Sequence, residues 1–313
     1  MKTTNICLSI ERMDEAFEKM VKRLSEVANV EVVGLDGLDL KDVDIFIGKK
    51  LSADTLKNAN RLKAVFTYKT GVDEFALAEL NERGIVLCNS HANSQYIAQY
   101  AFALALAITA RVVEFDKNLR QGDWSPSLNW RSLFSMKVGL VGYGSIGKEI
   151  NELLKANGIK AYTLNRGKSY DIETVDTLEQ LCDVADLLIL SLPKTAETND
   201  MFNAEIFAHL KGKYIVNVGR GNCIDEEALF QSLAKGEVAG AAIDTWRQKS
   251  RGEAKLFPSQ KHFEQLNNVL LSPHKAMQIA DGHDRYVTDV TDNVLSYLSG
   301  KEPRNIVNLK CGY

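Results

Sequence analysis

The sequence predicts two α/β domains, each a doubly wound parallel sheet with helices on both faces. Three observations support this fold class. Short apolar runs alternate with helix-period stretches along the whole chain. The alternation breaks clearly once, in the turn-rich segment GDWSPSLNWRS at 122–132, and starts again at Lys137. The 313 residues are more than one hydrophobic core usually organises, so two domains are expected.

The first half of the chain carries the expected strands of one sheet. They are short and apolar, and they lie at Asn5–Ser9, Val30–Gly34, Asp44–Gly48, Ala64–Tyr68 and Val86–Cys88. Helix-period stretches at Asp14–Val27 and Asp73–Arg83 lie between some of them. A long helix is then expected at Ser94–Arg120. Its most apolar part, Ala98–Ala110, is shorter than the roughly 20 residues that span a bilayer, which favours a buried helix.

The second half repeats the pattern and predicts a second parallel sheet. Its expected strands lie at Val138–Val141, Lys160–Leu164, Leu187–Ser191, Tyr214–Val218 and Gly240–Ile243. A helix is expected at Ile146–Asn157, between the first two strands. The final helix is expected at about Gly282–Ser299, followed by the polar tail GKEPRN.

The charges nearly balance, with 38 Lys and Arg against 41 Asp and Glu and a net charge of -3. This balance gives no electrostatic reason to expect nucleic acid or an anionic membrane as partner, although a small anionic ligand needs only one or two cations. The five cysteines are widely spaced and form no CxxC pair, so we expect neither a disulfide framework nor a metal site. Reduced thiols are typical of a cytosolic protein. Charges already appear at Glu11 and Arg12, so the N-terminus has no apolar run long enough for a signal peptide. Both observations indicate a cytoplasmic protein.

The segment KVGLVGYGSIGKEINELLKANG contains a GxGxxG pattern formed by Gly142, Gly144 and Gly147. The pattern alone is weak, but here an apolar strand precedes it and an amphipathic helix follows, which is the context of a dinucleotide site. The first glycine permits the tight turn, the second lets the backbone approach a pyrophosphate, and the third lets helix and strand pack closely. Three further residues lie inside this turn, namely Tyr143, Ser145 and Ile146. The alternative is a structural turn without a ligand.

The strand after this helix ends in Asn165, Arg166 and Lys168, where a carboxylate that binds the ribose 2′-hydroxyl of NAD is usual. No carboxylate stands there. Arginine and lysine at this place would instead bind a 2′-phosphate, so the sequence favours NADP over NAD. The alternative is a solvated basic turn beside a site that accepts NAD.

A set of spaced segments carries a wider resemblance. They are TGVDEF, GIVLCN, NSQYIAQYAFALALAITAR, QGDW, GLVGYGSIG, LILSLPKTAETNDMF, YIVNVGRGNCIDEEAL, GAAIDTW and NNVLLSPHKA. In this order they cover roughly residues 65 to 280 and resemble the D-isomer-specific 2-hydroxyacid dehydrogenase family, which includes glyoxylate/hydroxypyruvate reductases and phosphoglycerate dehydrogenase.

The resemblance implies a Rossmann coenzyme domain, at 94–282, inserted into a discontinuous, flavodoxin-like substrate domain at 1–93 and 283–313. It implies transfer of a hydride between a nicotinamide cofactor and a small 2-keto or 2-hydroxy acid, in a cleft between the domains. Family members are commonly homodimers joined through the coenzyme domain, so Trp124–Phe134 is expected to be a dimer arm.

The resemblance also implies roles for single residues. Backbone amides of Gly71 and Val72 would hold the substrate carboxylate. Arg220 would grip carboxylate and carbonyl oxygens, because a planar guanidinium suits bidentate binding. His274, the one histidine that follows an apolar strand through a Ser-Pro break, would be the general acid and base. The alternatives are a surface arginine and a structural histidine, with His91 as a distant second candidate.

Further positions align with the family's cofactor contacts. Asp244 resembles the residue that binds the nicotinamide carboxamide. The loops that contact the cofactor align with Leu192, Pro193, Thr198, Val218 and Gly219.

Two of the departures from the family pattern concern candidate site residues. Where a glutamate usually pairs with the histidine stands Lys249, so either Glu253 takes that role after a short insertion or the histidine works without a carboxylate, with Gln248 close by. In the segment TYKTGVD, Lys69 stands where small residues are frequent. It would either bind a second acidic group of the substrate or be a solvated loop lysine.

Two other functions remain open on the same scaffold. One is a non-catalytic protein that senses NAD(H), which the altered acid position keeps open. The other is oxidation of a simple anion such as formate or phosphite. Retention of Arg220 and His274 argues against the first, and turnover on keto acids distinguishes the second.

Overall fold

The computed structural model describes residues 4–35, 38–124, 127–167, 170–247, 257–279 and 282–313. The chain divides into two compact units. One combines both ends of the chain, Met1–Asn93 and Ile279–Tyr313, and is called the terminal unit below. The other, Ser94–Gln278, is called the central unit. The assignment of these units to substrate and coenzyme stays a prediction.

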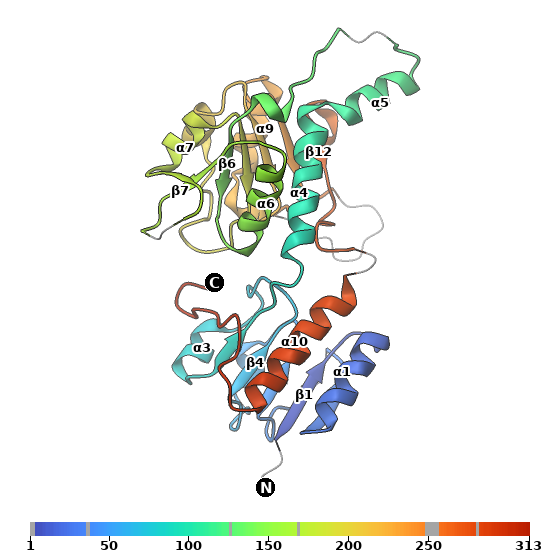
Figure 1. Ribbon diagram of the computed structural model, residues 1–313, viewed down its shortest axis with the longest axis vertical. Coiled ribbons are helices and arrows are strands. Elements are labelled where there is room, and N and C mark those ends of the chain that lie inside the picture. The colour runs from blue at the N-terminus through green and yellow to red at the C-terminus, as the bar shows by residue number, and fades with distance from the viewer. Residues whose placement is uncertain (1–3, 36–37, 125–126, 168–169, 248–256, 280–281) are drawn as a thin grey trace. The chain divides into compact units, whose positions relative to one another are not determined.

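The terminal unit is built on a five-stranded parallel sheet in the order β2-β1-β3-β4-β5 (Figure 1). The strands are β1 (Asn5–Ser9), β2 (Asn29–Val33), β3 (Ile45–Ile47), β4 (Ala64–Phe66) and β5 (Val86–Cys88). The order reverses between β1 and β3, as in a doubly wound sheet of the flavodoxin type. The strands lie where the apolar runs predict them, although β2 and β3 end one residue earlier than expected and β4 ends two residues earlier.

Helices cover both faces of this sheet. They are α1 (Glu15–Ser25), α2 (Ala53–Leu56), α3 (Leu77–Glu82) and α10 (His283–Leu298). On one face α1 and α10 pack against each other, although they come from opposite ends of the chain (Figure 1). Phe17 and Met20 of α1 and Val290 and Val294 of α10 are buried there against the strands. The opposite face is covered by α2 and α3.

The central unit contains a seven-stranded parallel sheet in the order β12-β11-β10-β9-β6-β7-β8. Its strands are β6 (Val138–Val141), β7 (Ala161–Leu164), β8 (Glu173–Val175), β9 (Leu187–Leu190), β10 (Tyr214–Asn217), β11 (Gly240–Ile243) and β12 (Val269–Leu271). The order reverses between β6 and β9, which is the switch point of a Rossmann sheet. Together the two sheets confirm the predicted fold class.

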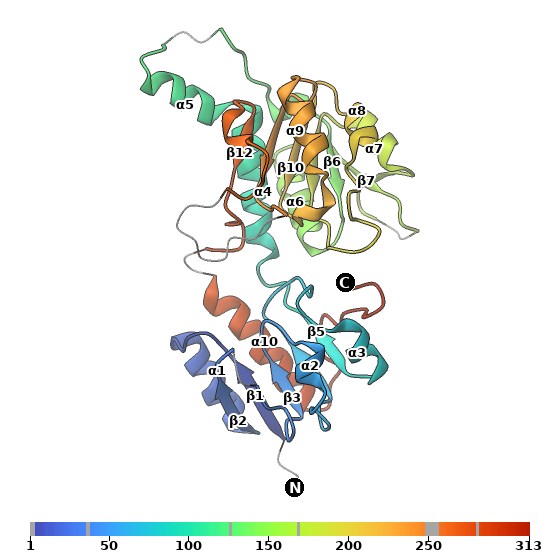
Figure 2. The same cartoon turned by 180° about the vertical axis from the view of Figure 1, so that it is seen from behind.

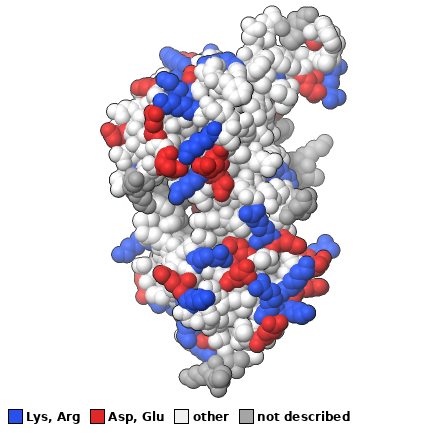
Figure 3. Space-filling model, viewed as in Figure 1, with Lys and Arg blue, Asp and Glu red and all other residues white. Residues whose placement is uncertain are grey.

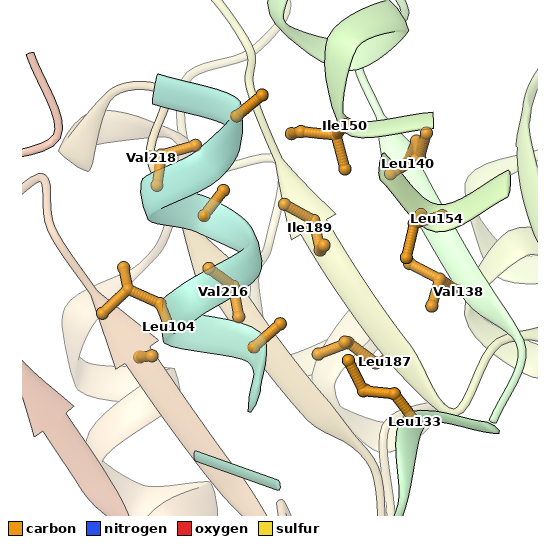
Figure 4. Close-up of a cluster of buried hydrophobic side chains, with 14 of the residues drawn as sticks. Leu104, Leu133, Val138, Leu140, Ile150, Leu154, Leu187, Ile189, Val216 and Val218 are labelled. Carbon is orange, nitrogen blue, oxygen red and sulfur yellow. The ribbon is translucent and has the colours of Figure 1, made fainter. Parts of the chain in front are cut away.

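Two layers of helices enclose the central sheet (Figures 1 and 2). The elements are α4 (Ser94–Thr109), α5 (Val112–Arg120), α6 (Ser145–Ala156), α7 (Leu178–Val184), α8 (Ala204–Ala208), α9 (Glu226–Ala234) and the short 3-10 helices η1 (Leu133–Ser135), η2 (Gly221–Cys223) and η3 (Phe263–Gln265). Figure 4 shows α4 and α6 on one face, where Leu104 and Ile150 belong to the same buried cluster as Ile189 of the sheet. On the other face lie α7, α8 and α9.

The expected single helix at Ser94–Arg120 is wrong. It breaks into α4 and α5, whose axes differ by 56°. Arg111, between them, has a left-handed backbone with φ of 54°, which ends the helical hydrogen-bond pattern. The break separates α4, which has a buried face, from α5, which buries no residue. α4 therefore follows the core of the central unit, and α5 extends into solvent.

Within the described residues, a single helix long and apolar enough to cross a bilayer is not found; only the bent pair α4 and α5, taken together, meets that criterion. Surface charge is mixed. On the face shown in Figure 3, Lys and Arg side chains alternate with Asp and Glu, so the described part of that face has no broad region of one sign.

Candidate functional site

The glycine turn joins β6 to α6 at the switch point of the central sheet. Gly142 has a φ of 102°, a conformation that side chains disfavour, and an added Cβ would lie 3.1 Å from Ser191 O. Ser191 Oγ donates to Gly142 O at 3.0 Å and fixes the turn against the end of β9. A Cβ on Gly147 would overlap the carbonyl oxygen of Gly142, so helix and strand are as close as glycine allows. The first and third glycines are thus required by the fold itself.

Gly144 is different, because a Cβ there would meet no protein atom within 4 Å. It occupies the N-cap of α6 and brings no capping side chain to the first-turn amides. A glycine that packing does not require, at an uncapped helix N-terminus, fits a site where an anion approaches the backbone. The turn therefore has the shape and donors that a dinucleotide pyrophosphate needs.

Tyr143, inside the turn, is held by its hydroxyl group. The hydroxyl donates to Asp171 Oδ1 at 2.7 Å and accepts from Asn151 Nδ2 at 2.8 Å. Burial and the hydrogen bond to Asp171 raise the pKa of Tyr143 above its usual range. Hydrogen bonds from Tyr143 and Lys155 lower the pKa of Asp171 to about 2, so this carboxylate is ionised at neutral pH. Ser145 and Ile146, both half-buried, begin α6 directly after the turn.

At the end of β7, Asn165 and Arg166 are exposed. Asn165 Oδ1 accepts from Gly167 N at 3.0 Å, and its Nδ2 lies 3.4 Å from Asp176 Oδ1, just past β8. Arg166 lies 3.8 Å from Glu197 in a solvent-exposed ion pair. Lys168 lies outside the described residues. Arg166 and two carboxylates, Asp176 and Glu197, therefore lie near the end of β7, where the sequence predicts that the ribose binds.

The loops after β9 and β10 meet closely. A Cβ on Gly219 would lie 2.6 Å from Leu192 N, so only glycine lets these strand ends approach. The loop after β9 is tied internally, because Thr198 Oγ1 donates to Pro193 O at 2.8 Å. Val218 is buried and donates its amide to Leu190 O at 3.0 Å. The loops after β9 and β10 thus lie against each other, and Ser191 connects them to the glycine turn.

Asn217, which the sequence analysis did not identify, holds the turn that carries Arg220. Its buried amide donates to Arg220 O at 3.1 Å and accepts from Gly219 N at 3.0 Å. The half-buried Arg220 also donates from Nη1 to Gly219 O at 3.0 Å. A Cβ on Gly221 would overlap the backbone of Trp246, which fixes the far side of the turn. The guanidinium is thus presented from a firmly held backbone.

Asp244, at the end of β11, is fully buried, and its carboxylate binds the loop that carries His274. It accepts from Lys275 N at 2.7 Å, from Ala276 N at 3.2 Å and from the hydroxyl of Ser272. His274 itself is exposed. The resemblance implies a nicotinamide contact for Asp244, and the structure adds this second task for the same side chain.

In the terminal unit, Lys69, Gly71 and Val72 lie in the loop after β4. Thr70 Oγ1 donates to Ser90 O at 3.0 Å, and Asn89 Nδ2 donates to Thr70 O at 2.6 Å, which ties this loop to the end of β5. Lys69 Nζ donates to Glu74 Oε2 at 2.6 Å, so its charge is already matched.

Within the central unit, the structure brings the candidates together along one edge of the sheet. The glycine turn, the Leu192 loop, the Arg220 turn, Asp244 and the His274 loop all follow the carboxyl ends of strands. This edge is where open α/β sheets bind ligands. The candidate partners of His274, namely Gln248, Lys249 and Glu253, lie outside the described residues.

The other histidines have ordinary surroundings. The half-buried His209 and the exposed His262 pair with Asp183 and Glu264 at 2.8 and 2.9 Å. His283 lies 3.1 Å from Asp14. His91 is half-buried, and burial lowers its pKa against the opposing effect of Asp289.

Residues 102–276 match the family described as D-isomer specific 2-hydroxyacid dehydrogenase, NAD binding domain. The chain is 30% identical over 272 residues to a glyoxylate reductase from Thermofilum pendens, covering 83% of this chain and 78% of the relative. It is 28% identical over 313 residues to a D-3-phosphoglycerate dehydrogenase from Methanocaldococcus jannaschii, covering 95% of this chain. The chain spans only 58% of that relative's length.

Solved structures show the same likeness. A protein from Pyrococcus horikoshii matches with a TM-score of 0.84 and 27% identity, over 97% of this chain and 95% of that one. An NADPH-dependent glyoxylate/hydroxypyruvate reductase from Sinorhizobium meliloti, solved with NADP and malonate, matches with a TM-score of 0.81 and 26% identity. That match covers 99% of this chain and 98% of the reductase.

Proposed function

This chain belongs to the D-isomer-specific 2-hydroxyacid dehydrogenase family, and from that membership we propose that it transfers a hydride between NADP or NAD and a small 2-keto or 2-hydroxy acid. The observation that carries the proposal is the shared edge of the central sheet. There a glycine turn suited to pyrophosphate, an arginine turn and a histidine loop follow β6, β10 and β12 of the same sheet.

The cofactor end of the site fits a dinucleotide. The glycine turn and the uncapped N-terminus of α6 would hold the pyrophosphate, and Asp244 would bind the carboxamide with its remaining acceptor capacity. When bound, the nicotinamide ring supplies or accepts the hydride.

The protein's own residues supply the rest of the chemistry. Arg220 would bind the carboxylate and the carbonyl oxygen of a 2-keto acid, and its charge would stabilise negative charge developing on that oxygen. His274 would donate a proton to the same oxygen in reduction and accept it in oxidation. Amides of Gly71 and Val72 would bind the carboxylate. Lys69 would join them only for substrates whose second acidic group displaces Glu74.

We propose NADP as the preferred cofactor, because Arg166 would pair with a 2′-phosphate. The ion pair with Glu197 is long and exposed, so a phosphate would compete with it readily. The NADPH dependence of the Sinorhizobium meliloti reductase supports the same preference.

We also propose a homodimer. Seven large apolar side chains from α5 to η1 are exposed, and they are called the apolar arm: Val112, Val113, Leu119, Trp124, Leu128, Trp130 and Phe134. Trp124 is 82% exposed and Phe134 is 77% exposed, and side chains of this size are seldom left in water together. A second copy of the chain would cover them.

A cytoplasmic location is supported by the five cysteines, all within the described residues and none in a disulfide.

The test is an assay of purified protein with glyoxylate, hydroxypyruvate and larger 2-keto acids, each with NADPH and with NADH. We expect turnover on at least one keto acid, and His274→Asn should lower kcat by about 10²- to 10⁴-fold while cofactor binding persists. His209→Asn, which changes a histidine of the same unit that is paired with Asp183, is the control. Cofactor binding without turnover on any acid would support a sensing role, and turnover on formate or phosphite alone would replace the keto acid assignment.

A further inference from the structure

His274 has a backbone conformation that residues other than glycine seldom adopt. Its φ is 56°, in the left-handed region, and it is one of four described non-glycine residues with a positive φ. Such a conformation is unfavourable for an L residue and persists only where the surrounding structure enforces it. Contacts on either side of His274 must therefore hold it in place.

The residues that flank His274 are fixed from both sides. After it, the amides of Lys275 and Ala276 donate to the two carboxylate oxygens of Asp244 at 2.7 and 3.2 Å. Before it, Ser272 donates its amide to Ile243 O at 2.9 Å and accepts at its carbonyl from Trp246 Nε1 at 3.0 Å. The histidine is thus the tip of a turn whose two stems are both tied to the end of β11.

A side chain on α4 completes this arrangement. The hydroxyl groups of Tyr100 and Ser272 lie 2.9 Å apart. Ser272 has one hydroxyl proton and donates it to Asp244 Oδ1, so the proton between the two hydroxyls must come from Tyr100. The hydrogen bonds therefore run in one direction, from Tyr100 to Ser272 to Asp244.

Tyr100 ties the turn to a rigid part of the molecule. It lies on α4, whose buried residues Ala101, Leu104 and Ala105 pack in a large core of the central unit. Tyr100 and Ser272 are 172 residues apart in sequence, so this hydrogen bond is a tertiary contact and not part of a local turn. The half-buried Tyr100, on a well-packed helix, can therefore hold in place a loop whose tip, His274, is exposed.

We propose that Tyr100 is a positioning residue for the proposed reaction: through Ser272 it holds Asp244 and the turn at His274 in the geometry needed for proton transfer. The inference rests on the proposed role of His274 as acid and base. Tyr100 touches neither substrate nor cofactor in this scheme. Its contribution is the placement of the imidazole, because small errors in placement at a reacting centre lower the rate strongly.

The test is Tyr100→Phe, which removes one hydroxyl and keeps the ring. We expect kcat for keto acid reduction to fall about tenfold, since displacement of a catalytic group can cost up to roughly 10²-fold. The KM for the keto acid should change by less than about twofold, because the turn that carries Arg220 is held by Asn217 and not by these hydrogen bonds. Tyr214→Phe, on β10 and outside these hydrogen bonds, is the matched control and should behave as the parent.

A second measurement does not depend on turnover. Hydrogen exchange of the Lys275 and Ala276 amides, followed by mass spectrometry on the peptide that contains them, should become faster in Tyr100→Phe and stay unchanged in Tyr214→Phe. Unchanged exchange would overturn the proposal even if the protein proved inactive on every acid. The proposed function is tested separately by His274→Asn: loss of activity supports it, and retained activity contradicts it.

A double-mutant cycle identifies the route of the effect. Tyr100→Phe should have no further effect on kcat in a Ser272→Ala background, because both changes interrupt the same hydrogen bonds. Ser272→Thr, which keeps a hydroxyl, should retain more activity than Ser272→Ala. Additive losses, or a fall in kcat that only follows a lower melting temperature, would mean that Tyr100 has a general structural role, and the proposal would be rejected.

Discussion

We expect cofactor choice to depend on few side chains at the end of β7. Arg166 is the described cation there, and Glu197 lies 3.8 Å from it. We predict that Arg166→Gln lowers kcat/KM with NADPH by about 10- to 100-fold, the usual effect of losing a hydrogen bond to a charged group, and leaves NADH nearly unchanged. Steady-state kinetics with both cofactors measure this.

A matched control for that change is Arg131→Gln. Arg131 is an exposed arginine of the same unit that lies 3.3 Å from Asp186, away from β7. Arg131→Gln should leave kcat/KM unchanged with both NADPH and NADH. A clear preference of the parent protein for NADH would reject the assignment to NADP.

The proton partner of His274 can be identified by its effect on pH dependence. A neighbouring carboxylate raises the pKa of a histidine, so the imidazole keeps its proton to higher pH. If Glu253 is this partner, Glu253→Gln should move the fall of reductive kcat/KM to lower pH and slow turnover. The measurement is kcat/KM for keto acid reduction across the pH range.

Glu264→Gln is the control for the pH profile. Glu264 is exposed and bonded to His262, so its replacement should leave the profile in place. If the profile of Glu253→Gln also stays in place, the histidine works without that carboxylate.

The residues that sequence reasoning missed share one property. Asn217, Ser272 and Tyr100 are common polar residues whose roles depend on contacts made only in the folded chain. Ser272 meets Asp244 across 28 residues and Tyr100 across 172. No spacing or periodicity in the sequence reports such contacts. Glycines and cations in named motifs could be singled out because their residue type alone restricts the chemistry.

At the level of elements, two alanine substitutions in the glycine turn should affect stability and cofactor affinity differently. Gly147→Ala places a methyl group against the carbonyl oxygen of Gly142, in backbone that cannot yield easily. We expect it to lower the free energy of unfolding by about 1–3 kcal/mol, as overpacking does, and to weaken cofactor binding. Thermal unfolding and NADPH titration measure the two effects.

Gly144→Ala should separate these effects. Its methyl group would meet no protein atom within 4 Å, so stability should be kept. Cofactor affinity should nevertheless fall, because the methyl group would stand where the pyrophosphate approaches the backbone. Normal NADPH affinity in Gly144→Ala would contradict the placement of the pyrophosphate at this turn.

Most strands could be predicted because buried parallel strands are short, continuous apolar runs. β6 and β11 begin and end at the expected residues. β8, with sequence Glu-Thr-Val, was missed because it is an edge strand with two exposed residues and no apolar pattern. The break at Arg111 was missed because neither glycine nor proline marks it.

For the whole molecule, the apolar arm predicts association. We expect the parent protein to be a dimer, and Trp124→Ser combined with Phe134→Ser to shift it toward monomer by removing the two most exposed aromatic side chains of the arm. Light scattering after size-exclusion chromatography gives the mass directly. Phe257→Ser, at another exposed apolar position outside the arm, is the control. A monomeric parent would refute the homodimer.

The two-sheet layout could be predicted at this scale because alternation of strands and helices depends on local pattern alone. The pairing of the chain's two ends within one unit is different. Nothing in the sequence of α10 shows that it packs on α1, so that feature could be expected only through the family resemblance.

The discontinuous make-up of the terminal unit matters for how the protein is synthesised. β1 to β5 leave the ribosome first, and α10 leaves it only after the whole central unit has been translated. Until then the part of this apolar sheet face that Val290 and Val294 cover, beside α1, stays exposed to solvent. The nascent chain therefore carries an N-terminal sheet with exposed, aggregation-prone apolar surface for most of its synthesis. In that interval a chaperone would protect it most.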